Sequence, residues 1–278
     1  MIPYSYSLHQ IHHPKEFGFD ADDYSRFKFG DGEVAKKFGC ELANGFIRDF
    51  LENDRIAEQI VVISSPYCFI PTATFAMKDH FVYQLNHWLA EQGRPVVQEA
   101  KVHRTITYKD DYGALSAEDR MKLIGNDLFH IDKEFLAGKT LFFLDDIKIT
   151  GSHERMILKM VKEYGLKNDI FMLYFAELAN MEIHPNIENF LNYHCVKSVF
   201  DLEDIISDGN FRFNTRIVKY ILNCGFNSFV TFLEGKDKEF ISSLYNLSLG
   251  NSYHEIESYA ENFNYLKNYL NNKNYKLI

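Results

Sequence analysis

The amino-acid sequence predicts an α/β fold in which a parallel sheet is flanked by helices. Three short apolar runs, at residues 60–63, 141–144 and 170–176, have the length and composition of buried strands. Segments with apolar residues at helical spacing stand between them. Strands that alternate with helices are joined by crossovers, and such crossovers make the strands parallel.

The N-terminal part supplies the first core strand and a helix on either side of it. Residues 1–30 are rich in aromatic residues, mixed in charge and without clear periodicity. Apolar residues then recur at helical spacing over residues 34–51, before the strand at 60–63. A second helix is expected over residues 72–92, and residues 96–106 are extended in character.

The middle of the chain contains a long polar connection and then the central strand at residues 141–144. Residues 107–139 are charged and carry only short helical patterns, such as the one at 117–124. A connection of this length inside an α/β core is typical of a functional loop or lid. A helix is expected over residues 154–164, and a last short strand at residues 196–200.

The C-terminal part has no clear strand pattern. Helices are expected over residues 217–224, 228–233, 239–249 and 253–270. The chain is therefore expected to comprise an N-terminal segment (1–30), an α/β core (31–201) and a helical C-terminal region packed on that core (202–278).

Composition excludes several classes of function. The 278 residues are 46% hydrophobic, yet no stretch of 18 apolar residues occurs, so no membrane segment is expected. The N-terminus lacks the pattern of a secretory signal. The four cysteines are scattered without a CxxC pair, which favours a reducing compartment and argues against structural zinc. A net charge of −9 makes nucleic acid an unexpected partner. These features predict a cytoplasmic protein that handles small molecules.

The segment from residue 140 to residue 154 carries the most specific chemistry. Asp145 and Asp146 come at the end of the central strand, and the turn at residues 150–152 precedes a helix. Ligands of α/β sheets bind at the carboxyl ends of strands. The start of a helix offers backbone N–H groups and a positive dipole end, which suit a phosphate. Paired carboxylates suit hydroxyl groups or hydrated Mg²⁺. The segment therefore predicts recognition of a sugar phosphate.

The same segment resembles the loop that binds 5-phosphoribosyl 1-diphosphate (PRPP) in type I phosphoribosyltransferases. The shared features are the apolar strand, Asp-Asp, an apolar residue, two variable residues and Thr-Gly. The family usually has an apolar residue at Lys148, a small residue at Ile149 and Ser or Thr at His153. Among its members the chain is most similar to the divergent, ComF-like predicted transferases. The resemblance implies a type I phosphoribosyltransferase-like sheet over the core, with a small N-terminal hood.

The resemblance also implies roles for this segment. Asp145 and Asp146 would bind the ribose hydroxyls, directly or through water on Mg²⁺, and are the candidate catalytic residues. The candidate 5′-phosphate residues are Ile149, Thr150, Gly151, Ser152 and His153. An ordinary helix N-cap at Thr150 or Ser152 is the alternative interpretation of the turn.

A second turn, after the strand at residues 60–63, stands where the family binds pyrophosphate. Ser64, Ser65 and Tyr67 are the candidate residues there, although a plain turn around a proline has the same sequence pattern. Arg104 and Lys109 gather positive charge before the long polar connection, where similar enzymes place a loop that closes over the reaction. A solvated strand end is the alternative meaning of that charge cluster.

The resemblance predicts a phosphoribosyl transfer from PRPP to a nitrogen nucleophile, with Mg²⁺ carried by PRPP and no metal ligand of the protein itself. A homodimer is common in the family. Two alternatives stay open: a regulator that binds PRPP or a nucleotide without catalysis, and a phosphatase or other sugar-phosphate enzyme on a similar sheet. Arg212 and Arg216 either line the cavity or start a helix capped by Asn214. The histidines at positions 9, 12 and 13 are taken as surface residues.

Overall fold

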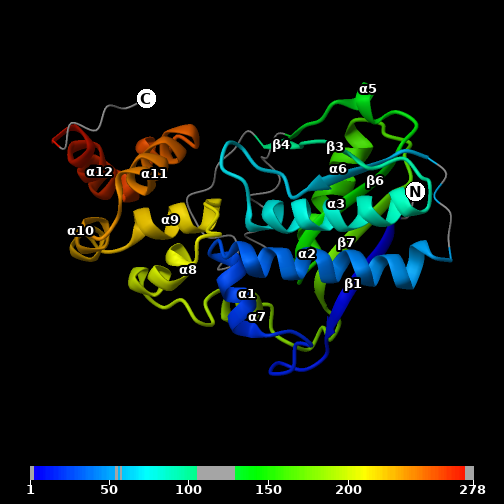
Figure 1. Ribbon diagram of the computed structural model, residues 1–278, viewed down its shortest axis with the longest axis horizontal. Coiled ribbons are helices and arrows are strands. Elements are labelled where there is room, and N and C mark those ends of the chain that lie inside the picture. The colour runs from blue at the N-terminus through cyan, green and yellow to red at the C-terminus, as the bar shows by residue number, and fades with distance from the viewer. Residues whose placement is uncertain (1–2, 54–55, 57, 105–128, 273–278) are drawn as a thin grey trace.

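The computed structural model of the protein describes residues 3–53, 56, 58–104 and 129–272. Within them, five parallel strands form one sheet with the order β1-β7-β6-β2-β3 (Figure 1). The strands are β1 (Tyr4–Ile11), β2 (Ile60–Ser64), β3 (Gln98–Glu99), β6 (Thr140–Lys148) and β7 (Ile170–Leu178). A separate antiparallel pair joins β4 (His103–Arg104) to β5 (Phe129–His130). The predicted parallel sheet is confirmed.

Strand β6 lies at the centre of the sheet and is longer than the sequence predicts. Its apolar run is buried on both faces, as is usual in parallel sheets. It pairs with β2 only as far as Ser64 opposite Leu144, whereas its pairing with β7 continues through Lys148. Asp145 and Asp146 therefore lie within β6, along a part of its edge that β2 leaves uncovered.

Helices cover both faces of the sheet. Alternate side chains of each strand point to opposite faces, and both sets are apolar, so each face is buried under helices. Helices α2 (Gly32–Phe46) and α3 (Ala73–Glu91) cover one face, and α6 (Ser152–Glu163) covers the other (Figure 1). Val62 and Phe142 pack with α2 and α3, whereas their neighbours along each strand pack with α6.

Helices α2 and α3 match the segments predicted at residues 34–51 and 72–92. The first prediction includes a π-helical turn, Ile47–Leu51, which continues α2. The two helices approach each other closely at Gly39, where a Cβ atom would lie 2.3 Å from the carbonyl oxygen of Met77. The sequence therefore needs glycine at this crossing.

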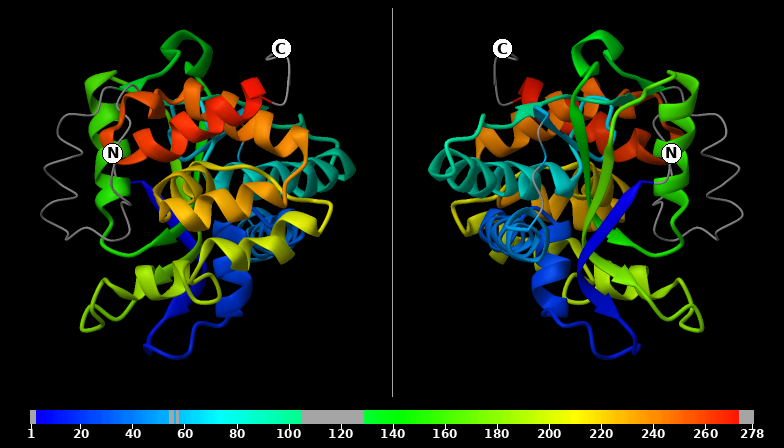
Figure 2. Two further views of the ribbon diagram at one scale, coloured as in Figure 1. Left: turned by 90° about the vertical axis from the view of Figure 1, so that its left-hand side faces the viewer. Right: turned by 90° about the vertical axis from the view of Figure 1, so that its right-hand side faces the viewer.

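The C-terminal helices form a core of their own at one end of the molecule (Figure 1, left; Figure 2, left). They are α8 (Glu203–Ser207), α9 (Thr215–Asn223), α10 (Phe226–Glu234), α11 (Lys238–Gly250) and α12 (Ala260–Asn272). The helix predicted over residues 253–270 is interrupted, because two 3₁₀ turns, Tyr253–Glu255 and Glu257–Tyr259, precede α12. Phe29 and Ile70 from the rest of the chain complete this core.

The segment after β2 is held by hydrogen bonds from the C-terminal helices. The side-chain oxygen of Asn251 accepts hydrogen bonds from the backbone N–H groups of Phe69 and Ile70, both at 3.0 Å. The Thr215 hydroxyl donates to the Ile70 carbonyl at 2.8 Å. Asn214 donates to the Lys28 carbonyl at 3.1 Å. The C-terminal helices thus fix the chain near the end of β2 and of α1 (Ala21–Lys28).

The two ends of the predicted core differ from expectation. Residues 4–11, expected to be irregular, form β1, which pairs with β7 along the sheet edge (Figure 2, right). The strand predicted at 196–200 is wrong, because a 3₁₀ turn, Val199–Leu202, follows irregular backbone there. Val196 and Val199 of that segment belong to the C-terminal core. The boundaries at residues 30 and 201 stay a prediction.

The remaining helices are short, namely α5 (Lys133–Leu136) and α7 (Ile187–Asn192). The helical pattern at residues 117–124 and the candidate residue Lys109 lie outside the described residues. None of the helices described is long and apolar enough to span a membrane.

Candidate active site

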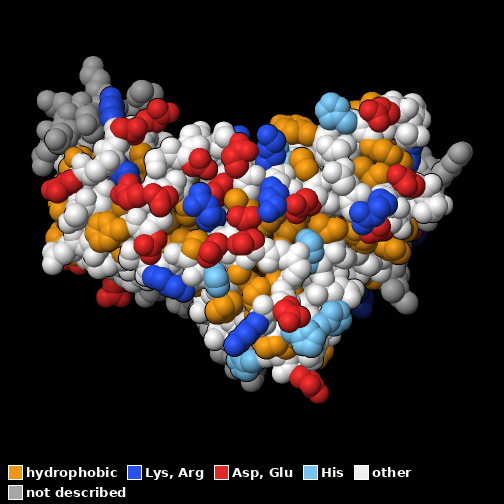
Figure 3. Space-filling model, turned by 60° about the horizontal axis from the view of Figure 1, so that its bottom comes forward, with side chains coloured by type: hydrophobic (Ala, Val, Ile, Leu, Met, Phe, Trp, Pro, Cys, Tyr) orange, Lys and Arg blue, Asp and Glu red, His pale blue; other side chains and the backbone are white. Residues whose placement is uncertain are grey.

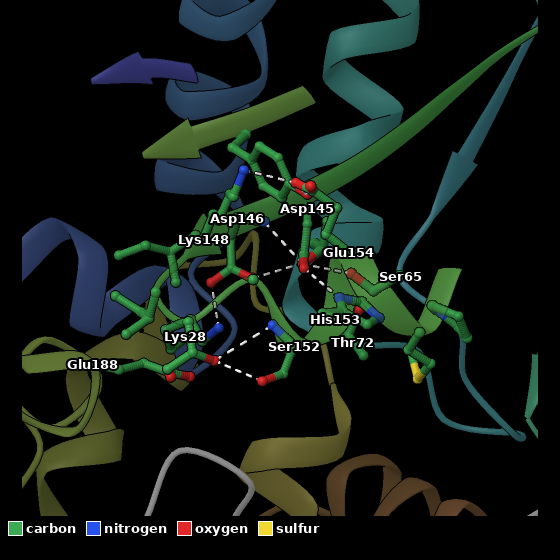
Figure 4. A pocket seen from close by; sticks show the side chains of 18 of the residues that line it. Lys28, Ser65, Thr72, Asp145, Asp146, Lys148, Ser152, His153, Glu154 and Glu188 are labelled. Carbon is green, nitrogen blue, oxygen red and sulfur yellow. Dashed lines mark hydrogen bonds and ion pairs between the residues drawn. The ribbon is translucent and has the colours of Figure 1, made fainter. Parts of the chain in front are cut away.

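An open pocket lies at the carboxyl ends of β2 and β6, where β6 runs past the end of its neighbour. It encloses about 950 Å³, including solvent at its mouth. The acidic pair from β6, the turn from Ile149 to His153, Ser65 after β2 and Arg104 all line it (Figure 4). The structure therefore brings together the two turns that the sequence places at strand ends.

Asp145 accepts hydrogen bonds from several parts of the site. Its Oδ1 accepts from the hydroxyl of Ser65 at 2.7 Å and from the backbone N–H of Asp146 at 3.0 Å. Its Oδ2 lies 2.5 Å from Nδ1 of His153 (Figure 4). Burial raises the pKa of Asp145, but the charge and hydrogen bond of His153, with Ser65 and Lys28, outweigh burial and hold that pKa below its usual value.

Asp146 is held by three side chains that are distant in the sequence. The Tyr24 hydroxyl donates to its Oδ2 at 2.5 Å, and the Lys28 ammonium contacts the same oxygen. The Thr74 hydroxyl donates to Oδ1 at 3.1 Å. Burial, with the charge and hydrogen bond of Asp146, raises the pKa of Tyr24 well above its usual value, so Tyr24 is a fixed donor.

The two carboxylates line the pocket and have room for further donors. Each carboxylate oxygen can accept about two hydrogen bonds. Among the described contacts, Oδ2 of Asp145 accepts only from His153, and Oδ1 of Asp146 accepts only from Thr74. One acceptor position on each residue thus remains for a ligand, and two neighbouring hydroxyl groups would match this pair.

The turn before α6 is built to present backbone N–H groups. Gly151, the N-cap residue of α6, has φ of +66°, a conformation that glycine adopts readily. A glycine N-cap has no side chain to accept hydrogen bonds from the first turn, and the Thr150 hydroxyl accepts from the Ser152 N–H only at 3.4 Å. A ligand can therefore take the place of a capping side chain. The hydroxyls of Thr150 and Ser152 bond each other at 2.8 Å. Arg155 bonds the Thr150 carbonyl and the Ser152 hydroxyl, both at 3.0 Å, and fixes the turn.

Ile149 and Lys148 do not offer their side-chain ends freely to the pocket. Ile149 is buried in the core beneath α2 and α3, so it can contribute only its backbone to a ligand. The Lys148 ammonium pairs with Glu154 at 2.8 Å, and the hydroxyl of Tyr174 donates to the same Glu154 oxygen at 2.9 Å. This pair forms one wall of the pocket (Figure 4).

The predicted pyrophosphate residues are only partly gathered. Ser65 and Arg104 line the pocket, but the Ser65 hydroxyl already bonds Asp145. Ser64 is buried at the end of β2, and neither it nor Tyr67 belongs to the pocket lining. The ring of Tyr67 lies 4.0 Å from the ammonium of Lys101 instead.

Several residues that line the pocket or contact the acidic pair were not predicted. Tyr24 and Lys28 are one helical turn apart on α1, and no sequence pattern connects them with the acidic pair. Thr74 could have been predicted from the sequence, because it lies in the first turn of the helix that follows β2. Glu188 and Arg216 also line the pocket. Arg216 thus lines the cavity, as one interpretation of the sequence expects. It also stands at a helix start, as the other expects, because Asn214 caps α9 by accepting from the Arg216 backbone N–H at 3.0 Å.

A divalent metal coordinated directly by the acidic pair does not fit these contacts. Mg²⁺ requires a near-octahedral shell of oxygen ligands. Here an ammonium group contacts Asp146 and a histidine contacts Asp145. No group of three or more His, Cys, Asp or Glu side chains in the described part of the chain is arranged to hold a metal ion. The Mg²⁺ that the resemblance implies, carried by PRPP, stays a prediction.

We expect acid to remove a stabilising contribution of Asp145. Because its pKa is lower in the folded protein, this contribution is fully present above the unfolded-state pKa, about 4, and is lost as the pH falls through the folded-state pKa. The free energy of unfolding, measured with urea at several pH values below about 4, should fall more steeply for the wild type than for Asp145→Asn. The exposed Asp208→Asn is the control, and equal slopes for all three proteins would contradict the expectation.

Comparisons with known proteins agree with this geometry. The protein is of the α/β class, with an acidic pair beside a helix start that has a glycine N-cap, at the strand ends of a parallel sheet. This arrangement is chemically suited to a phosphorylated, hydroxyl-bearing ligand. The model of one protein family, described as PRTase ComF-like, matches residues 2–266. The chain belongs to this family, and the resemblance inferred from the sequence is confirmed.

Solved structures with a detectable likeness include hypoxanthine phosphoribosyltransferases. One from Staphylococcus aureus is 8% identical, with 54% of this chain and 75% of that chain covered and a TM-score of 0.34. One from Trypanosoma cruzi is 15% identical, with 54% and 77% covered and a TM-score of 0.31. A search of curated proteins finds no match. The assignment of the family therefore rests on the match over residues 2–266.

Proposed function

We propose that the protein binds PRPP and transfers its 5-phosphoribosyl group to a nitrogen nucleophile, with release of pyrophosphate. The observation that carries this proposal is the position of two open carboxylate acceptors next to a helix start whose N-cap residue is glycine. Asp145 and Asp146 present these acceptors, and Gly151 begins the helix. A ribose 5′-phosphate has complementary groups, because its two hydroxyls can donate to the carboxylates and its phosphate can accept from the helix start.

The ligand would lie across the strand ends. Its 5′-phosphate would rest on the backbone of residues 150–153, and its ribose hydroxyls would donate to Asp145 and Asp146. The diphosphate would point toward Ser65, which bonds Asp145, and toward Arg104, which also lines the pocket. Figure 4 supports this placement, since Ser65 and Ser152 flank the acidic pair.

The transfer needs little covalent chemistry from the protein. The nitrogen lone pair forms a bond to C1′ of the ribose while the bond from C1′ to the diphosphate oxygen breaks. The bonding electrons leave with the diphosphate, and the proton of the nucleophile passes to solvent. The ribose carries positive charge in the transition state, and the carboxylates of Asp145 and Asp146 would stabilise it. The protein also orients the two reactants.

The acceptor would be a small molecule that enters near α1. Lys28 and Glu188 stand together at the end of the pocket away from Ser65 (Figure 4). Lys28 belongs to the N-terminal segment, which supports the predicted contribution of residues 1–30 to a hood. On the face shown in Figure 3, basic and acidic side chains are interspersed, in keeping with a small-molecule partner rather than nucleic acid. A homodimer stays a prediction.

A regulator that binds PRPP or a nucleotide without catalysis is the second candidate. The incomplete pyrophosphate side favours it, because Ser65 is engaged by Asp145, and Ser64 and Tyr67 lie outside the pocket lining. A site with few donors for the leaving group would still hold the ribose phosphate while stabilising the departing diphosphate weakly.

Pyrophosphate release distinguishes these functions. The protein is incubated with PRPP, Mg²⁺ and a panel of purines, pyrimidines and simple amines. Release that depends on an acceptor, and that Asp145→Asn/Asp146→Asn abolishes while Asp208→Asn does not, supports transfer. Saturable PRPP binding without release for any acceptor would make the protein a regulator. Turnover of a sugar phosphate in the absence of PRPP would instead support the sugar-phosphate enzyme.

A further inference from the structure

The acidic pair already has a cation of its own. The ammonium group of Lys28 contacts Oδ2 of Asp146, the oxygen that also accepts from the Tyr24 hydroxyl. Lys28 and Tyr24 are one turn apart on α1, so the same helix delivers both donors to one carboxylate oxygen. The contact is therefore built into the fold rather than made by a mobile surface chain.

Burial makes this ion pair a fixed feature of the pocket. The side chains of Lys28 and Asp146 are 11% and 7% exposed. A pair so far removed from water is screened weakly, and each charge depends on the other. The end of α1 is fixed as well, because Asn214 donates to the Lys28 carbonyl at 3.1 Å.

We propose that Lys28 is a built-in counterion that takes the place of a divalent metal at the acidic pair. A metal ion at Oδ2 of Asp146 would have to displace both the ammonium and the tyrosine hydroxyl, or bind beside a like charge. Oδ1 of Asp145 already accepts from Ser65 and from the Asp146 backbone. The two oxygens with an open position belong to carboxylates that already contact Lys28 or His153. The site thus receives the ribose hydroxyls with the charge of Asp146 already balanced by Lys28.

This inference goes beyond the proposed function, because it concerns the protein without PRPP. It predicts that Asp145 and Asp146 bind no divalent ion in the wild type. It also predicts that removal of the lysine charge creates such a site, since two adjacent carboxylates without a neighbouring ammonium attract a hard cation. Lys28 then acts as a positioning residue through Asp146.

Mn²⁺ alone is the probe, and its binding to the full chain is measured by electron paramagnetic resonance. The wild type and Asp146→Asn should bind Mn²⁺ equally weakly. Lys28→Met should bind it at least about tenfold more tightly, as expected when a repelling unit charge is removed beside the site. Lys28→Met/Asp146→Asn should lose this gain. Lys37→Met, which breaks the exposed pair with Asp23, is the matched control and should show no gain.

Two results would overturn the proposal. One is that the wild type binds Mn²⁺ and Asp146→Asn weakens this binding. This comparison tests the proposal even if Lys28→Met does not fold. The other is a folded Lys28→Met protein without increased Mn²⁺ affinity. Binding of ribose 5-phosphate by the wild type in the presence of EDTA is measured alongside. If the wild type does not bind ribose 5-phosphate, that result counts against the proposed function, whereas the Mn²⁺ measurements test the role of Lys28 independently.

Discussion

Ser152→Asp is expected to abolish binding of ribose 5-phosphate. Ser152 is the first residue of α6, and its hydroxyl is held by Thr150 and Arg155. A carboxylate at this position would accept hydrogen bonds from Arg155 and from the helix start, where the phosphate is proposed to lie. Two like charges about 4 Å apart near a protein surface repel by about 4 kcal/mol, which corresponds to roughly a thousandfold in affinity.

Two control variants separate the effect of charge from the effect of substitution. Ser152→Ala removes one hydroxyl and should weaken binding by about tenfold or less. Ser207→Asp adds the same charge at an exposed site on α8 and should leave binding unchanged. Calorimetric titration measures the affinities, and thermal unfolding shows that each variant is folded. If a folded Ser152→Asp protein binds ribose 5-phosphate as tightly as the wild type, the phosphate does not bind at this turn.

Asp146→Ala is expected to lower the free energy of unfolding by about 3–5 kcal/mol, the usual cost of leaving one partner of a buried ion pair uncompensated. The variant would leave the Lys28 ammonium and the Tyr24 hydroxyl without their shared acceptor. Lys28→Met/Asp146→Leu removes both charges and should recover much of the loss.

The matched control for Asp146→Ala is a surface pair. Asp23→Ala breaks the exposed contact with Lys37, at 2.9 Å, and should cost about 1 kcal/mol or less. Urea denaturation measures all four proteins. If Asp146→Ala costs no more than Asp23→Ala, the contacts of Asp146 do not stabilise the fold as described.

The sequence predicts those parts of the fold whose signal is local. The strand runs at residues 60–63 and 141–144 are apolar over their whole length because both sheet faces are covered. Strand β1 gives no such signal, since it is a partly exposed edge strand that depends on pairing with β7. The segment at residues 196–200 gives a false signal, because Val196 and Val199 pack in the core of the C-terminal helices instead of in a sheet.

The residues of the candidate site, too, are predictable from the sequence where their signal is local. Asp145 and Asp146 precede the turn at residues 150–152 within one short segment, so a single stretch of sequence shows the acidic pair and the helix start together. Tyr24 and Lys28 reach Asp146 across 122 and 118 residues, and only the folded chain brings them to it. The balance of charge at the pair is therefore a property of the tertiary structure.

Titration of the protein with PRPP in a calorimeter, in the presence of Mg²⁺, tests the central claim most directly. The wild type should bind PRPP saturably at one site per chain. Asp145→Asn/Asp146→Asn, which keeps the shape of both side chains but removes their charge, should bind at least about a hundredfold more weakly, because two hydrogen bonds to charged acceptors are lost. A folded wild type that does not bind PRPP, or a double variant that binds it equally well, would contradict the assignment of this site.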